Sequence, residues 1–339
     1  MRPSKYSPPK TRLHSAAKPQ RRPRAPAPPP TLPAALALAW ALSGCVSLRP
    51  FAEVRREQGA ERFLAIAGQQ VYIEQQGRGE PVVLLHGFGS SSYCWRRVMP
   101  ELARSFRVVA LDLNGFGYTE RPKDPRSYTR EGQERLILSV MDALGIARAH
   151  LVGHSYGGGL TLFLAARHPE RLRSMVLVDS SAPTYPDDRR SPLARVRPLN
   201  ALYLRYALRP EFIQKTLRNS FFDASLATPE LARAYLDRLR VEGEEDAYYG
   251  LTVSNRRPPV AVELGKIDVP ALIVWGSEDR LIQPDDGRRA ARRLPRATFV
   301  AIPNTGHLPM EERPEEWLGI VLPFLASQSE APCPAAGEP

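Results

Sequence analysis

The chain has 339 residues, 43% of them hydrophobic, which is enough to bury the core of one large domain or two small ones. A short disulfide-stapled protein and a fully disordered chain are therefore excluded. The formal charge is +11 at pH 7, but residues 1–44 alone hold eight Lys or Arg side chains and no Asp or Glu. The other 295 residues carry 39 basic and 36 acidic side chains, so we expect no nucleic-acid partner.

The first 44 residues are predicted to be a leader rather than a folded domain, because ten of the 34 prolines lie there. The uncharged apolar run Thr31–Leu42 has the length of the hydrophobic region of a signal peptide. The Leu-Ser-Gly-Cys sequence that ends at Cys45 resembles the lipobox of bacterial lipoproteins. This resemblance implies lipid attachment at Cys45 and a membrane-anchored protein of the bacterial cell envelope, periplasmic or at the outer membrane. If the run is only an apolar linker, the protein is cytoplasmic.

Apolar segments of four to eight residues alternate with helical patterns after the leader, and two neighbouring segments near residue 70 are close enough to pair as a hairpin. The apolar positions of 136–144 have helical spacing. Continuous Val/Leu runs joined by helices predict the α/β class, with a doubly wound, mostly parallel sheet covered on both faces. The predicted strands lie at 63–67, 71–74, 82–85, 108–111, 151–152, 175–178, 272–275 and 299–302.

The alternation stops between Ser181 and about Ile267, where helical segments follow one another without a convincing strand. An insertion of this size is expected above the carboxyl edge of the sheet, where open α/β sheets bind ligands. We interpret it as a cap whose aromatic residues mostly pack onto the core, while some line an apolar pocket. The predicted division is a leader at 1–45, a core at 60–182 and 266–326, the cap at 183–265, and a flexible tail at 327–339.

The segment Leu151–Gly159 contains a strand, a Gly-x-Ser-x-Gly turn and the start of a helix. A sharp strand-to-helix turn lifts Ser155 out of the sheet, and only small residues at Gly153 and Gly157 allow it to close. This setting resembles the nucleophile elbow of the α/β-hydrolase superfamily, in its serine branch with a helical cap. The resemblance covers about residues 60–326 and extends to esterases and epoxide-hydrolase-like proteins.

A serine hydroxyl needs a base and a third group that orients the base. His307 follows the last predicted strand, where the superfamily places its base. The same resemblance implies that Asp279, after the preceding strand, is the acid. Spacing alone does not exclude the adjacent Glu278, and Asp179 is a second possibility, because some relatives carry the acid after that earlier strand.

The His-Gly loop at His86 and Gly87 follows the third predicted strand and also resembles the family. The resemblance implies that the backbone N–H groups of Phe88 and Tyr156 form the oxyanion hole. His86 is expected to brace this loop. His154 is expected to pack beneath the elbow.

These residues predict a serine hydrolase that cleaves small or medium apolar carboxylic esters through an acyl-serine. A carbon–carbon bond hydrolase or a lactonase with the same triad is the alternative. A third possibility, of another class, is a non-catalytic ligand-binding module on the same scaffold. The small-molecule ester would be the substrate, and no residue spacing indicates a metal or another cofactor.

Overall fold

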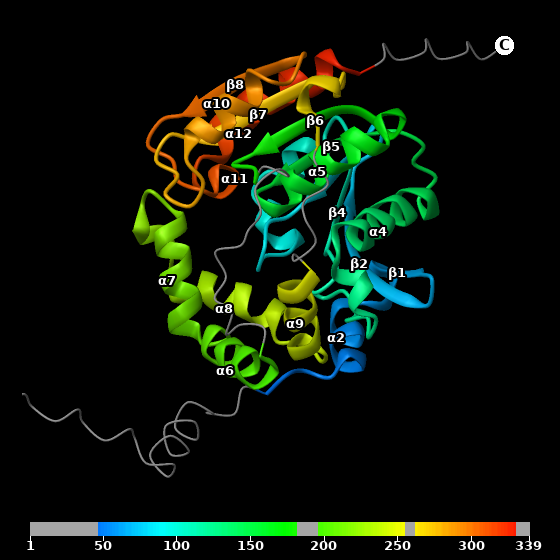
Figure 1. The fold of residues 1–339 in the computed structure, drawn as a ribbon, viewed down its shortest axis with the longest axis vertical. Coiled ribbons are helices and arrows are strands. Elements are labelled where there is room, and N and C mark those ends of the chain that lie inside the picture. The colour runs from blue at the N-terminus through cyan, green and yellow to red at the C-terminus, as the bar shows by residue number, and fades with distance from the viewer. Residues whose placement is uncertain (1–46, 182–195, 255–261, 330–339) are drawn as a thin grey trace, which may run out of the picture. The chain divides into compact units, whose positions relative to one another are not determined.

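All eight predicted strands form, and they make one sheet in the order β1-β2-β4-β3-β5-β6-β7-β8 (Figure 1). β1 pairs antiparallel with β2, as the predicted hairpin, and β2 pairs antiparallel with β4, whereas every other neighbouring pair is parallel. The predicted doubly wound, mostly parallel α/β sheet is therefore confirmed. The strands are β1 (Phe63–Ile66), β2 (Gln69–Gln76), β3 (Pro81–Leu85), β4 (Arg107–Leu111), β5 (Ala149–His154), β6 (Leu172–Val178), β7 (Ala271–Gly276) and β8 (Ala297–Ile302).

This computed structural model describes residues 47–181, 196–254 and 262–329, which belong to one unit, Leu42–Pro339. The apolar run at 31–42, Cys45, Cys333 and the tail after residue 329 lie outside the described residues. Cys94 is buried with a free thiol.

Both faces of the sheet are covered because successive side chains of a strand point to opposite faces. On β3, Val83 and Leu85 join one apolar cluster, with α4, α5 and α10, and Val82 and Leu84 join the other, with α3 and α12. The helices outside the cap are α2 (Phe51–Gln58), α3 (Met99–Leu102), α4 (Arg130–Ala143), α5 (Tyr156–Arg167), α10 (Pro284–Ala291), α11 (Pro309–Glu312) and α12 (Pro314–Ser327). This two-sided core fixes the sheet edge from which the candidate site is built.

Between β6 and β7 the described residues form four helices, which Figure 1 shows gathered to one side of the sheet. They are α6 (Arg197–Ala207), α7 (Pro210–Ser220), α8 (Pro229–Leu239) and α9 (Glu244–Ser254). We call these four helices the cap. The end of α7 reaches the carboxyl edge of the sheet, because the backbone N–H of His307 donates to the carbonyl of Ser220 at 2.6 Å.

Candidate active site

Ser155 lies between the end of β5 and the start of α5, with backbone angles φ 50° and ψ −113°. A residue with a side chain rarely adopts this conformation, and such strain is typical of functional turns. The flanking glycines are required by space: a Cβ on Gly153 would lie 2.4 Å from the carbonyl oxygen of Gly157, and one on Gly157 would lie 2.3 Å from that of Leu85. The local chain therefore folds as the Gly-x-Ser-x-Gly pattern predicts.

His307 and Asp279 are brought together from the loops after β8 and β7. The Nδ1 atom of His307 is 2.7 Å from Oδ2 of Asp279, and both side chains are buried. Because Nδ1 donates to the carboxylate, the neutral imidazole leaves Nε2 as the acceptor for a proton. This is the arrangement that a general base requires.

The turn that carries Ser155 packs against the loop of His307 through His154. The ring of His154, the preceding residue, lies 4.8 Å from the ring of His307, centroid to centroid. Among the described residues, no hydrogen bond joins the Ser155 hydroxyl to His307. Catalytic hydrogen bonds of a free enzyme are often longer than in its substrate complex and shorten when substrate binds.

The structure separates the three candidate acids. Glu278 is exposed, and its carboxylate accepts a hydrogen bond from the neighbouring Ser277 hydroxyl. Asp279 is buried and faces His307, and its other oxygen accepts the backbone N–H groups of Leu281 and Ile282 at 2.8 and 3.1 Å. Burial opposes ionisation of Asp279, but the hydrogen bonds from His307 and the two amides lower its pKa below the ordinary value.

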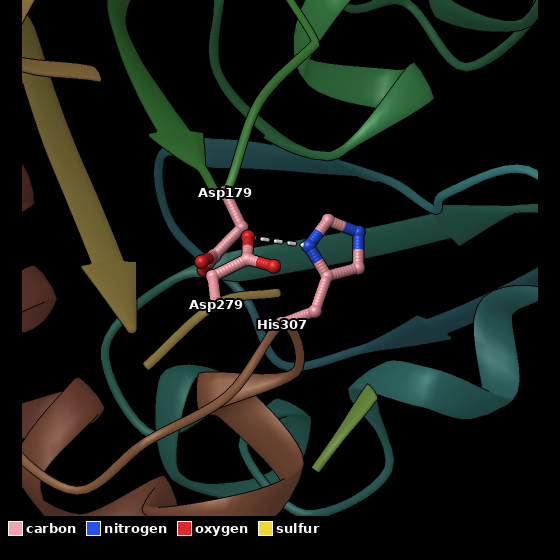
Figure 2. A group of neighbouring side chains, drawn as sticks. All are labelled: Asp179, Asp279 and His307. Atoms are coloured by element: carbon pink, nitrogen blue, oxygen red, sulfur yellow. Dashed lines mark hydrogen bonds and ion pairs between the residues drawn. The ribbon is translucent and has the colours of Figure 1, made fainter. Parts of the chain in front are cut away.

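Asp179 follows β6, and Figure 2 shows its side chain together with those of Asp279 and His307. It is fully buried, and Oδ1 accepts the backbone N–H of Gly276 at 3.0 Å. Burial and the nearby Asp279 charge raise the pKa of Asp179 well above its ordinary value. Asp179 is thus close to the acid position without contacting His307 by a hydrogen bond.

Among the described residues, one group of side chains could hold a metal ion. It consists of Asp179, Asp279 and His307, whose possible ligand atoms lie within 4.8 Å of one another. Nδ1 of His307 already donates to Asp279 at 2.7 Å, and the raised pKa of Asp179 disfavours its anionic form, so the donor set suits proton transfer better than metal binding.

The proposed oxyanion loop approaches the elbow from the end of β3. Tyr156 is the first residue of α5, so its N–H lies at the positive end of a helix. Phe88 is on the loop after β3, and its ring centroid is 6.2 Å from that of Tyr156. His86 braces this loop: Nε2 accepts from the N–H of Leu113 at 3.0 Å, and Nδ1 is 2.7 Å from the carbonyl of Gly87.

The loop that carries His307 is held from two sides. His154 is buried beneath the elbow, and its Nε2 lies 2.7 Å from the carbonyl oxygen of His307. Burial lowers the pKa of His154 to about 3, so this ring stays neutral and donates. On the other side, the Glu312 carboxylate accepts backbone N–H groups of Gly306, Phe222 and Asp223 at 2.7, 3.2 and 2.7 Å. The sequence pattern did not identify Glu312 as a functional residue. The only sign of it in the sequence is the pair of acidic residues, Glu311 and Glu312, shortly after His307.

A second buried cluster fastens the cap to the core. Glu311 on α11 accepts a hydrogen bond from the Tyr235 hydroxyl of α8. Arg96 pairs with the same carboxylate at 2.7 Å. The sequence did not indicate this cluster, because Tyr235 lies 76 residues before Glu311 and Arg96 lies 215 residues before it.

Aromatic side chains surround the elbow and the oxyanion loop. Phe88, 38% exposed, lies edge-on to the rings of Phe116, Tyr156 and the cap residue Tyr248, with centroid separations of 5.1, 6.2 and 6.4 Å. Aromatic side chains of the core and of the cap therefore meet at Phe88, on the oxyanion loop.

A family model described as the alpha/beta hydrolase fold matches residues 80–314. The chain belongs to this family. It is a hydrolase, and the match covers both halves of the core as well as the cap between them.

Among curated proteins, the 2-hydroxymuconate semialdehyde hydrolase of Pseudomonas sp. (strain CF600) is 32% identical over 80% of this chain and 95% of its own length. Among solved structures, a membrane phospholipase A, described as a bacterial virulence factor, is 28% identical, with a TM-score of 0.65 over 88% of this chain and 97% of that chain. The enol-lactonase of Burkholderia xenovorans LB400 is 26% identical, with a TM-score of 0.65 over 78% of this chain and 99% of that chain. Relatives of similar fold thus carry different hydrolase names.

Within residues 47–181, 196–254 and 262–329, no helix has both the length and the apolar character needed to cross a bilayer.

Proposed function

We propose that the protein hydrolyses apolar carboxylic esters through an acyl-enzyme on Ser155, with Asp279 and His307 as its acid and base. The observation that carries this proposal is the buried 2.7 Å contact between His307 and Asp279 beside a strained serine turn. A nucleophile, a base and an orienting carboxylate in this order are the parts that acyl transfer requires.

In the first half of the reaction, the Ser155 hydroxyl oxygen attacks the ester carbonyl carbon, and its proton passes to Nε2 of His307. The N–H groups of Phe88 and Tyr156 stabilise the oxyanion. His307 then gives its proton to the leaving alcohol, and the acyl group remains on Ser155. In the second half, water attacks the acyl carbon, its proton passes to His307 and then to the Ser155 oxygen, and the carboxylic acid leaves.

The surroundings of Ser155 support a neutral, apolar acyl group. The rings of Phe116, Tyr156 and Tyr248 gather around Phe88 on the oxyanion loop, as described above. Two arginines at the boundary of cap and core are already bound to carboxylates: Arg121 to Glu244 at 2.8 Å, and Arg96 to Glu311 at 2.7 Å. Neither is available to neutralise a substrate carboxylate without breaking a buried ion pair, which costs several kcal/mol.

A second candidate is hydrolysis of a carbon–carbon bond in a vinylogous diketone, or of a lactone. The names of the relatives favour this candidate, because 2-hydroxymuconate semialdehyde contains no ester and the enol-lactonase opens a cyclic one. The same three residues serve both candidates, and the cap residues decide between them.

A substrate panel tests the proposal. Purified protein is assayed with short-chain nitrophenyl esters, lactones and vinylogous diketones, and Ser155→Ala serves as the matched control. The highest kcat/KM on the esters, lost in Ser155→Ala, is the expected result. The highest value on diketones would replace the ester proposal with the second candidate, while leaving the triad in place.

The proposal also places the protein at a bacterial envelope membrane through a lipid on Cys45. The lipobox-like sequence supports this, as does the similarity to a membrane phospholipase A, which extends over more of the chain than the similarity to the enol-lactonase does. Cys45→Ala should release unlipidated protein from the membrane fraction. Unchanged fractionation, or wild-type protein in the soluble cytoplasmic fraction, would contradict the anchor.

A further inference from the structure

The exposed face of α6 is the largest run of exposed apolar side chains on one helix of the described residues. Its members are 41–47% exposed: Leu199, Tyr203 and Tyr206 of α6, and Val196, which precedes the helix as its N-cap. Their spacing of three, four and three residues places them on one side of the helix. The inward side of α6 is occupied separately, because Leu204 is buried against α8. A contiguous exposed apolar face on a helix is typical of an interaction surface.

The chain enters the folded unit next to this helix. Leu48 packs against the cluster that contains Leu204 and Leu208. Arg49 forms a parallel bridge with Val241, at the end of α8, and its N–H donates to the carbonyl of Arg240 at 2.8 Å. Figure 1 shows the described start of the chain, in blue, leading from α2 towards α6. Leu48 and Arg49 are thus held against the cap.

The covalent distance from a membrane attachment is short. Cys45 is three residues before Leu48, which allows at most about 10 Å between their Cα atoms, and the apolar run ends six residues before Leu48, at most about 20 Å away. If either element is held in a bilayer, Leu48, which packs against the cluster that contains Leu204 and Leu208, lies within about that distance of it.

The charge of this part of the cap suits an anionic surface. Residues 196–220 contain one acidic residue, Glu211, and five basic ones: Arg197, Arg205, Arg209, Lys215 and Arg218. Arg197 pairs with Asp246 and Arg205 with Glu245, but these pairs are exposed. Exposed ion pairs contribute little stability, so these arginines can exchange partners with lipid headgroups.

A row of aromatic rings connects this face with the candidate nucleophile. Neighbouring ring centroids along the row are 5.2–6.4 Å apart, in the order Tyr206, Phe212, Tyr203, Tyr248, Phe88 and Tyr156. Tyr156 is adjacent to Ser155. An acyl chain that leaves the bilayer at α6 would therefore meet apolar surface along the way to the oxyanion loop.

We propose that the face formed by Val196, Leu199, Tyr203 and Tyr206 docks on an anionic lipid bilayer, from which the enzyme takes a membrane-resident ester. The docking rests on the proposed attachment through the leader, and the substrate class rests on the proposed ester hydrolysis. Aromatic and apolar residues enter the acyl boundary, while the arginines of the same segment face the headgroups.

Photo-labelling with a lipid tests the docking without any assay of activity. The full-length wild-type chain is reconstituted in phosphatidylcholine/phosphatidylglycerol vesicles that contain a phospholipid with a diazirine in its acyl chain. After irradiation, labelled peptides are mapped by mass spectrometry. We expect labels within 196–209 and none on α12. A membrane-attached chain without label on α6, or a chain that does not attach at all, overturns the proposal. Crosslinks between α6 segments of two copies, without lipid label, would instead make this face a dimer interface.

A pair of charge variants separates docking from chemistry. Leu199→Asp places a carboxylate on the docking face, and Ala326→Asp places one on an exposed position of α12. Leu199→Asp should slow hydrolysis of a vesicle-embedded ester on the order of tenfold, because about 1.4 kcal/mol of interfacial binding is lost. Hydrolysis of a water-soluble short ester should stay unchanged in both variants, and Ala326→Asp should change neither rate. Equal rates of hydrolysis on vesicles for the two variants would refute docking. A wild-type protein that hydrolyses neither the vesicle-embedded ester nor the water-soluble ester would refute only the ester chemistry.

Discussion

Replacing Asp279 by Asn should abolish most of the activity, for a reason that the hydrogen bonds of the site make specific. Oδ1 of Asp279 accepts two backbone N–H groups, from Leu281 and Ile282. An amide at this position must keep its oxygen there, so its NH₂ group faces Nδ1 of His307. The imidazole then carries its proton on Nε2 and cannot accept the proton of Ser155.

The same change in a serine-protease triad lowers kcat about 10⁴-fold, which corresponds to about 5 kcal/mol of transition-state stabilisation. We expect a loss of that order for Asp279→Asn. Asp179→Asn is the matched control, since Asp179 makes no hydrogen bond to His307 and the amide oxygen can still accept the N–H of Gly276. Its loss should stay below about tenfold, or about 1.4 kcal/mol.

The assay is the rate constant for modification of the protein by a fluorophosphonate, which does not depend on knowing the substrate. Circular dichroism checks that both variants fold. Retention of more than a tenth of the rate in Asp279→Asn would refute the assignment of the acid. An equal loss in the two variants would show that Asp179 shares that role.

Three further outcomes are expected. Gly157→Ala should prevent correct closure of the elbow, since its Cβ would lie 2.3 Å from the Leu85 carbonyl oxygen, and fluorophosphonate labelling of a folded variant at the wild-type rate would contradict this. Tyr235→Phe removes a donor to the buried Glu311 and should lower the free energy of unfolding by about 1–3 kcal/mol in urea titrations; no change would show that the cluster does not fasten the cap. Burial lowers the pKa of His86 to about 4 from an ordinary 6.5, so the unfolded chain binds more protons between these values, and the free energy of unfolding should fall as the pH is lowered from 6.5 to 4. His86→Gln, which does not titrate, should show a smaller fall, and an identical pH profile would contradict the assignment.

The strands and the elbow could be predicted because their signals are local. Apolar runs such as 82–85 and 272–275 and the glycines around Ser155 determine structure within a few residues. The position of His307 after the last strand followed from chain order, and the structure places it against Asp279.

The contacts that join distant segments could not be predicted from one sequence. The position of Asp179 beside Asp279 depends on the neighbouring positions of β6 and β7 in the sheet. The bond from Tyr235 to Glu311 depends on how α8 packs against α11. The aromatic row depends on cap side-chain directions, which helical periodicity does not fix. Such features are set by tertiary packing.

The reactivity of Ser155 is the central claim, and it is tested most directly by mass-spectrometric mapping of the fluorophosphonate adduct on the folded full-length protein. We expect one adduct, on the peptide that contains Ser155, and its absence in Ser155→Ala. A folded wild-type protein that takes up no reagent, or an adduct that persists in Ser155→Ala, would contradict it.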